Sequence, residues 1–248
     1  MLPILLIHGF PLDGTMWRHQ AHFLRASGYE VHTPDLPGFG HPPAGVSPAI
    51  GEATMERYAA VIHAIIQQFP GERAIVGGFS MGGYIMLALL REHPECVAAA
   101  MFIDTRAEVD APEGRATRLK SIDHMETHGT ENLIDSLCQR LFRKTAPARE
   151  VIEETRTIMR RQPASSVIAA QWAMAHRRDQ TDVIPALQMP TLIVVGEEDL
   201  ITPPASAEAM AARLAHTNLV RIPNAGHMAP MEQPDAVNKA IGEFVAHL

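Results

Sequence analysis

Continuous apolar runs and helically spaced apolar positions alternate along most of the chain. The runs are apolar at nearly every position, as in residues 2–7 and 97–103, which is typical of parallel strands buried on both faces. Between them, apolar residues recur every three or four positions, as in residues 54–69, which predicts amphipathic helices. The alternation predicts an α/β fold with a doubly wound, mostly parallel sheet. The expected strands are residues 2–7, 30–33, 73–76, 97–103, 190–196 and 218–222.

The pattern changes at Arg106. From there to about residue 187 charges are dense and strand patterns are weak, while helical spacing recurs. A helical block of about 80 residues between two buried strands indicates an insertion on the main fold. We therefore expect a core formed by residues 1–105 and 188–248, and an inserted segment formed by residues 106–187. Its expected helices are residues 116–128, 131–142, 148–160 and 165–178.

The net charge and the composition limit the kinds of binding partner and the cellular compartment that we expect. A formal net charge of -7 argues against nucleic acid or an anionic membrane as the main partner. Cys96 and Cys138 lack metal-ligand spacing and are interpreted as buried free thiols, which fits a reducing compartment. The first residues lack a basic leader, and no run reaches the ~18 apolar residues of a membrane span. A cytoplasmic protein is expected, as a monomer or homodimer acting on a small molecule.

A glycine-rich stretch between an expected strand and an expected helix carries a candidate nucleophile. Residues 78–82 read Gly-Phe-Ser-Met-Gly, the Gly-x-Ser-x-Gly pattern of a nucleophile elbow, in which a sharp turn exposes the serine oxygen. A Cβ at either glycine would collide with a neighbouring element at such a bend. An ordinary glycine-rich loop is the alternative, but the flanking strand and helix favour Ser80 as a nucleophile.

A serine nucleophile requires a base and an acid that orients the base. His227, in the loop after the last expected strand, is the candidate base among 13 histidines because of that position. Asp199 follows the strand that ends at Gly196 and is the candidate acid. Three other carboxylates compete for that role: Glu197, Glu198 and Asp104.

Two backbone amides are candidates for an oxyanion hole. Phe10 follows the first strand, whose loop lies beside the elbow in a parallel sheet, and Met81 follows Ser80 directly. Their N–H groups can bind a developing oxyanion. The N-terminus of the elbow helix adds a favourable field for negative charge.

These motifs together resemble the α/β-hydrolase superfamily over essentially the whole chain. They appear in that family's order: residues 8–11, His-Gly-Phe-Pro; 35–40, Asp-Leu-Pro-Gly-Phe-Gly; 78–83, Gly-Phe-Ser-Met-Gly-Gly; 196–199, Gly-Glu-Glu-Asp; and 224–227, Asn-Ala-Gly-His. The resemblance implies Ser80 as nucleophile, Asp199 as acid, His227 as base and the inserted segment as a helical cap. The hairpin usually found before the His-Gly strand is missing, so a six-stranded sheet lacking the first two strands is expected, with an early edge that needs protection.

Within that family the chain is most similar to small esterases, enol-lactonases and carbon–carbon bond hydrolases. A cofactor-independent serine hydrolase acting on an ester or lactone is the first hypothesis. A carbon–carbon bond hydrolase or a cofactor-free perhydrolase with the same triad is the second, and a ligand receptor on a hydrolase fold is the third.

Several other side chains are candidates for binding a substrate or a metal. Trp17 and Trp172 are candidates to line the substrate pocket. His124 and His128 have zinc-ligand spacing, but no third ligand is evident, so no metal is expected. Residues 177–178, both arginine, are interpreted as a solvated helix face, with binding of a substrate carboxylate as the alternative.

Overall fold

A computed structural model describes residues 1–144 and 148–248 of the chain. Its centre is one six-stranded sheet in the order β2-β1-β3-β4-β5-β6, and every neighbouring pair is parallel. The strand count and the parallel pairing confirm the sequence-based prediction. The strands are β1 (Ile4–Ile7), β2 (Val31–His32), β3 (Ala74–Phe79), β4 (Val97–Ile103), β5 (Thr191–Gly196) and β6 (Thr217–Ile222).

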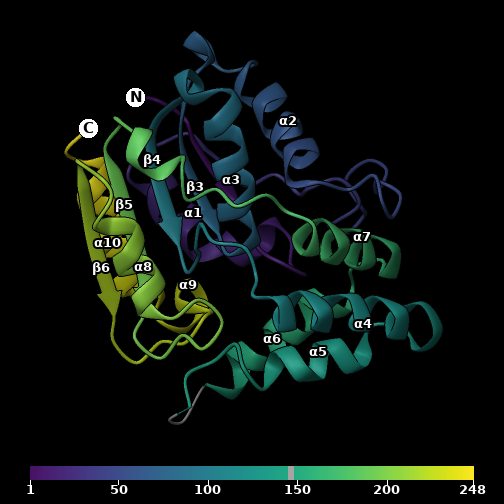
Figure 1. Cartoon of the computed structure of the whole chain (residues 1–248). Coiled ribbons are helices and arrows are strands. Elements are labelled where there is room, and N and C mark those ends of the chain that lie inside the picture. The colour runs from purple at the N-terminus through teal and green to yellow at the C-terminus, as the bar shows by residue number, and fades with distance from the viewer. Residues whose placement is uncertain (145–147) are drawn as a thin grey trace.

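Helices cover both faces of the sheet (Figure 1). Successive side chains of β1 alternate between two apolar clusters, with Leu5 and Ile7 in one and Ile4 and Leu6 in the other. The first cluster includes side chains of α2 (Met55–Ile66), α3 (Met81–Glu92) and α8 (Pro204–Ala211). The second includes those of α1 (Arg18–Ala26), α9 (Ala229–Glu232) and α10 (Pro234–Val245). Because both faces are covered, the inner strands β1, β3, β4 and β5 are buried at nearly every position, whereas the edge strand β6 is mostly half-buried.

The helix after the elbow lies deepest in the molecule. All residues of α3 from Met81 to Leu90 are buried, because α3 packs between β3 and α2. A helix that is apolar all round requires such a position. This packing fixes the N-terminus of α3, and with it the residue that precedes the helix.

Among its described residues, the inserted segment holds four α-helices: α4 (Pro112–His128), α5 (Glu131–Cys138), α6 (Arg149–Arg160) and α7 (Ala164–Ala175). Figure 1 shows them gathered at one end of the sheet, in the direction in which the strands point. Their bounds lie close to the expected ones. The described part of the chain also forms four short 3-10 helices: η1 (Gly14–Trp17), η2 (Pro70–Glu72), η3 (Pro94–Cys96) and η4 (Ile184–Ala186).

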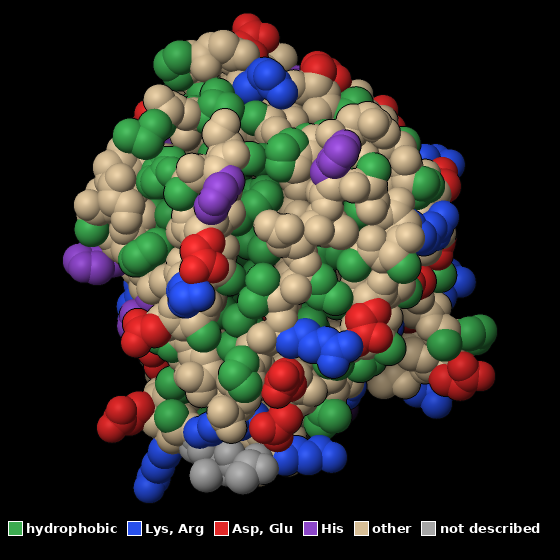
Figure 2. Space-filling view, turned by 90° about the vertical axis from the view of Figure 1, so that its left-hand side faces the viewer, with side chains coloured by type: hydrophobic (Ala, Val, Ile, Leu, Met, Phe, Trp, Pro, Cys, Tyr) green, Lys and Arg blue, Asp and Glu red, His purple; other side chains and the backbone are tan. Residues whose placement is uncertain are grey.

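The two sheet edges differ in length. At the early edge, β2 has only two residues, which leaves little backbone to pair with another chain. At the other edge, β6 carries the exposed Arg221, which is paired with Glu208. Figure 2 looks onto the side of the molecule where β6 and α10 lie, and hydrophobic side chains are scattered there among polar and charged ones.

Both cysteines are free, as predicted, with Cys96 buried and Cys138 half-buried. Burial raises the pKa of Cys96 to about 11, which makes it a poor nucleophile. Among the described helices, none combines the length and apolar character needed to cross a bilayer.

Candidate active site

Ser80 occupies the sharp turn between β3 and α3. Its backbone φ of 52° and ψ of -113° are unusual for a residue with a side chain. The flanking glycines are required by sterics: a Cβ on Gly78 would lie 2.5 Å from the carbonyl oxygen of Gly82, and a Cβ on Gly82 would lie 2.4 Å from that of Ile7. The turn therefore has the close backbone approach that the Gly-x-Ser-x-Gly pattern predicts.

His227 lies beside this serine, in the loop after β6. Its Nε2 atom is 2.9 Å from the Oγ of Ser80, and its Nδ1 atom is 2.7 Å from an Oδ of Asp199. The ring is almost fully buried and packs against Phe79, with 5.1 Å between the ring centroids. Residues 147 positions apart in sequence are thus brought within hydrogen-bond distance.

Asp199 is held by its own turn. One carboxylate oxygen accepts the N–H groups of Ile201 and Thr202, and the other accepts the hydroxyl of Thr202 as well as facing His227. Burial acts to raise the pKa of Asp199, but the charge and hydrogen bond of His227 and the bonds from Thr202 outweigh it, so the pKa is lowered. The carboxylate is therefore ionised and oriented toward the imidazole.

The competing carboxylates have other neighbours. Glu197 is exposed, and Glu198 accepts the backbone N–H of Lys144. Asp104 is fully buried at the end of β4, where one oxygen accepts the N–H of Gly196 at 2.7 Å. Its second oxygen has no hydrogen-bond partner among the described residues. Burial, followed by the charge of Asp199, raises the pKa of Asp104 well above its ordinary value, so this carboxyl tends to stay protonated.

The loop that carries Phe10 is fixed by a buried histidine. The Nε2 atom of His8 accepts the N–H of Leu36 at 3.0 Å, so Nδ1 carries the proton and donates to the carbonyl oxygen of Gly9 at 2.9 Å. Burial lowers the pKa of His8, consistent with a neutral ring. Met81 is the first residue of α3, so its N–H has no acceptor within the helix. Both amides are thus candidates for binding an oxyanion.

A cavity of about 640 Å³ opens at the serine, a size suited to a small ligand. Ser80, His227, Phe10 and Tyr84 line it from the sheet side, and side chains of α4, α5 and α7 line it from the inserted segment. The sequence analysis does not identify Tyr84 as a cavity residue. Tyr84 lies one helical turn after Ser80, the residue that caps α3, and this spacing of four residues could have indicated that the two side chains lie on the same side of the helix.

Neither predicted pocket tryptophan lines this cavity. Trp17 is fully buried and packs edge-on against Phe79, with ring centroids 6.2 Å apart. Trp172 lies against His176 at 3.9 Å between ring centroids. The side chain of Met81 is likewise buried in the apolar core. On α7 the residues that line the cavity are Gln171 and Met174, on either side of Trp172 in sequence.

An arginine cluster borders the same cavity. Arg106 and Arg118 both bind the carboxylate of Asp110, which Arg177 also binds at 2.7 Å. Arg177 is buried and its guanidinium lies 4.3 Å from the centre of the Tyr84 ring, so the prediction of a solvated face is wrong for Arg177. The neighbouring Arg178 is exposed, as predicted.

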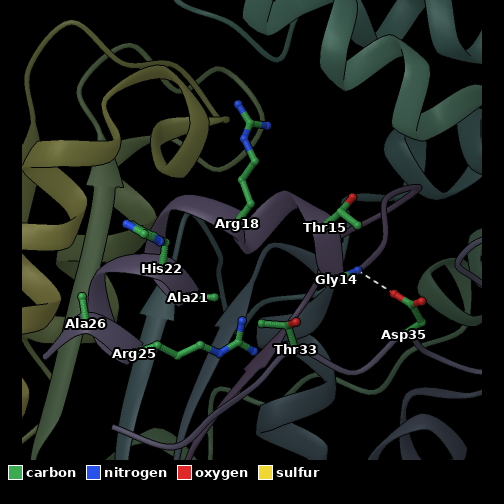
Figure 3. A pocket seen from close by; sticks show the side chains of 9 residues that line it. All are labelled: Gly14, Thr15, Arg18, Ala21, His22, Arg25, Ala26, Thr33 and Asp35. Carbon is green, nitrogen blue, oxygen red and sulfur yellow. Dashed lines mark hydrogen bonds between the residues drawn. The ribbon is translucent and has the colours of Figure 1, made fainter. Parts of the chain in front are cut away.

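A second pocket, of about 510 Å³, lies along α1 and contains none of the triad residues. Figure 3 shows Arg18, His22 and Arg25 projecting from this helix, with Asp35 accepting the N–H of Gly14 nearby. Arg18 is paired with Glu154 and Arg25 with the carbonyl oxygen of Val31. This pocket has no arrangement for nucleophilic chemistry.

Histidine clusters lie away from the triad. His124 and His128 stack at 4.3 Å between ring centroids, and His124 contacts Asn132. Among the described residues, one group of three possible metal ligands has its ligand atoms within 4.8 Å of one another: His63, His93 and Glu95, none of which lines the cavity. The triad itself contains no metal-ligand set.

The chain is similar to several known proteins. A thermophilic esterase from Thermogutta terrifontis, solved with malate bound, superposes with a TM-score of 0.93 at 39% identity, covering 100% of this chain and 90% of that one. The pimeloyl-[acyl-carrier protein] methyl ester esterase of Xanthomonas campestris is 27% identical over 99% of this chain and 95% of its own. The enol-lactonase of Burkholderia xenovorans has a TM-score of 0.87 at 24% identity, covering 99% of this chain and 92% of that one, which bears on the fold alone.

A family model described as the alpha/beta hydrolase fold matches residues 3–234, which include all of β1 to β6 and the loops that hold Ser80, Asp199 and His227. The chain therefore belongs to the alpha/beta hydrolase fold family.

Proposed function

We propose that this protein is a serine esterase that hydrolyses a carboxylic ester or lactone through an acyl-enzyme. The observation that carries the proposal is the continuous contact from Ser80 Oγ to His227 at 2.9 Å and from His227 to Asp199 at 2.7 Å. A nucleophile, a base and an orienting acid in this sequence of contacts are what acyl transfer requires. The esterases among the compared proteins support the same chemistry.

In the proposed reaction, Ser80 Oγ attacks the ester carbonyl carbon while Nε2 of His227 takes the hydroxyl proton. The imidazolium then gives this proton to the leaving alkoxide as the carbon–oxygen bond breaks, which leaves Ser80 acylated. Water, deprotonated by His227, attacks the acyl-enzyme and releases the carboxylic acid. Asp199 stays ionised throughout and stabilises the imidazolium.

The negative oxygen of the tetrahedral intermediate would lie between the backbone N–H groups of Phe10 and Met81. Met81 begins α3, so the partial positive charge of the helix N-terminus acts on the same oxygen. A donor of this kind contributes about 100- to 1000-fold in rate. Because both donors are backbone groups, replacing a side chain does not remove them. Their role is tested by a structure with a bound transition-state analogue, whose oxyanion should lie within hydrogen-bond distance of both N–H groups.

The inserted segment acts as a cap in this proposal. Its helices supply the cavity wall opposite Ser80, so the cap side chains would select the substrate while the core supplies the chemistry.

The experiment combines active-site labelling with hydrolysis of a short p-nitrophenyl ester. A fluorophosphonate should label Ser80, identified by peptide mapping, and Ser80→Ala should remove both the label and nearly all turnover. Ser165→Ala is the matched control, since it removes the hydroxyl of an exposed serine of α7 that does not line the cavity. Labelling of a different residue, or substantial turnover by Ser80→Ala, would contradict the proposal.

The same preparations should be assayed with a β-diketone and for peracid formation. These assays separate ester hydrolysis from the carbon–carbon bond hydrolase and perhydrolase alternatives, which use the same triad. Faster turnover of either alternative substrate than of every ester tested would replace the proposed reaction while leaving the triad in place.

A further inference from the structure

The helix α4 presents a polar stripe to the active-site cavity. Gly114, Thr117, Arg118 and Ser121 all line it, with the spacing of one helix face. A helix that packs against a protein usually turns an apolar stripe inward. Here most of the α4 residues that line the cavity are small, hydroxyl-bearing or cationic, with His124 and the apolar Met125 at the end of the stripe, and the polar ones suit a polar ligand group.

The facing helix α5 continues this polar lining. Asn132 and Ser136 line the cavity one turn apart, and Arg140 follows just after the helix. Apolar residues also line the cavity on these helices, at Met125 of α4 and at Leu133 and Leu137 of α5. We call the polar and cationic residues that α4, α5 and Arg140 contribute to the lining the polar part of the cavity.

The charge of the polar part is positive. The described lining residues include four cationic side chains, Arg106, Arg118, Lys120 and Arg140, and a single carboxylate, Asp110. Asp110 is already shared by Arg106, Arg118 and Arg177, so one negative charge faces three positive ones.

Glu108 adds a second negative charge to this cluster, because its carboxylate interacts electrostatically with Arg106. With it, the buried cluster has three cations and two anions, and Lys120 and Arg140 add two exposed cations at the cavity. The polar part thus keeps an excess of positive charge.

Arg118 is the cation best placed to bind an anion. Its Nε donates to Asp110 at 2.7 Å and its Nη1 donates to Gln171 at 2.8 Å, so the guanidinium is fixed in orientation. Its Nη2 makes no hydrogen bond to any of the described residues, and 21% of the side chain is exposed. A fixed guanidinium with an unused edge binds an anion at little entropic cost.

We propose that this polar part is a carboxylate subsite, and that the enzyme acts on esters or lactones whose acid or alcohol portion carries a free carboxylate, bound by Arg118 with Arg140 and Lys120 adding charge. This inference rests on the proposed esterase function. The reacting carbonyl lies at Ser80, and the remote carboxylate lies among the polar side chains of α4 and α5.

The test compares two substrates that differ only in charge: mono-(p-nitrophenyl) adipate and its methyl ester, p-nitrophenyl methyl adipate. The wild-type enzyme should hydrolyse the free acid with a kcat/KM at least about 10-fold higher, because a charge-assisted hydrogen bond gives about 10- to 100-fold. Added salt should reduce this ratio, since part of the attraction is screened.

Arg118→Gln should lower kcat/KM for the acid by about 10- to 100-fold and for the methyl ester by less than about threefold. Arg118 also holds Asp110, so a second variant, Arg140→Gln, is needed. The Arg140 side chain forms no ion pair with any of the described residues, so its replacement disturbs no other contact of this kind. Arg140→Gln should lower the ratio of kcat/KM for the acid to that for the methyl ester by about 2- to 5-fold. Arg160→Gln is the control, since Arg160 lies on α6 outside the cavity and should leave the ratio unchanged.

The two proposals fail in different ways. Equal kcat/KM for both substrates in the wild-type enzyme, with Ser80 labelled by fluorophosphonate, overturns the carboxylate subsite and leaves the esterase intact. An acid preference that Arg118→Gln and Arg140→Gln both preserve also overturns it. Hydrolysis of neither substrate, with no label on Ser80, overturns the esterase function itself.

Discussion

At the scale of single residues, two buried aspartates near the triad have opposite electrostatic environments. Asp199 is surrounded by donors and by His227, which lower its pKa, whereas Asp104 has one donor and an unpartnered oxygen, and its pKa is raised. Both follow parallel strands at the same end of the sheet. Their position along the chain therefore does not distinguish the acid, but their neighbours do.

Asparagine substitutions should separate the two roles. Asp199→Asn should lower kcat by about 10⁴-fold, because the amide no longer holds the tautomer of His227 that accepts the serine proton. Asp104→Asn should change kcat by less than about threefold, because Asp104 does not contact the imidazole. Steady-state kinetics on one p-nitrophenyl ester measure both, and a larger loss for Asp104→Asn would move the acid role to that residue.

Asp104→Asn should also change how the free energy of unfolding depends on pH. A group whose pKa is raised in the folded state contributes stability that is lost as pH rises from its unfolded pKa, about 3.9, through its folded pKa. Asparagine does not titrate, and its amide can occupy the site without charge. Asp104→Asn should thus become more stable relative to wild type as pH increases above about 4, measured by urea unfolding. A difference that is constant with pH would show that Asp104 is not protonated in the fold.

At the scale of elements, the inserted segment is joined to the catalytic loops by specific contacts. Arg161, just after α6, donates two hydrogen bonds to Asp13, at 2.7 and 2.6 Å, and Gln162 donates a third at 2.7 Å. Asp13 is fully buried and belongs to the loop that follows Phe10. The loop proposed to bind the oxyanion is thus anchored to the inserted segment.

Two adjacent arginines provide a matched test of this anchor. Arg161→Ala removes two charged hydrogen bonds from a buried carboxylate, so the free energy of unfolding should fall by about 1–3 kcal/mol. Arg160→Ala removes an exposed ion pair with Glu131 and should leave the unfolding midpoint nearly unchanged. Chemical denaturation measures both. Equal losses would show that the Asp13 contact contributes no more than a surface pair.

At the scale of the whole molecule, several carboxylates are stabilised in their ionised form. Asp13, Asp110 and Asp199 all have lowered pKa values, because the arginines, the imidazole or the hydrogen-bond donors around them outweigh the effect of burial. They lie in the anchor, in the arginine cluster and in the triad. Their ionisation therefore supports the contact between core and inserted segment as well as the site.

Acid should destabilise the fold, because these carboxylates lose their charge. A group with a lowered folded pKa contributes stability that is fully present above its unfolded pKa, about 3.9, and is lost as pH falls below it. The free energy of unfolding should therefore drop as pH falls below about 4, followed by circular dichroism. Asp110→Asn should flatten part of this drop, and an unchanged slope in that variant would contradict the assignment.

Much of this arrangement could be predicted from sequence because the signals are local. The strands, the elbow around Ser80 and the loops of Asp199 and His227 are each defined by fewer than about 20 consecutive residues. The direction of Trp17 and the partners of Arg177 could not be predicted, since they depend on packing between distant elements. Arg177 meets Asp110 across 67 positions of the chain, and no local pattern marks that pair.

The backbone of residues 141–144 contacts both the loop of Asp199 and the loop of His227. These contacts decide whether the inserted segment can be removed from the protein. Leu141 accepts the N–H of Met228, Arg143 donates its N–H to Glu232, and Lys144 donates its N–H to Glu198. A Cβ on Gly226 would lie 2.5 Å from this backbone. Excising residues 106–187 would remove these partners from both loops, so the inserted segment is part of the framework that holds the loops of Asp199 and His227.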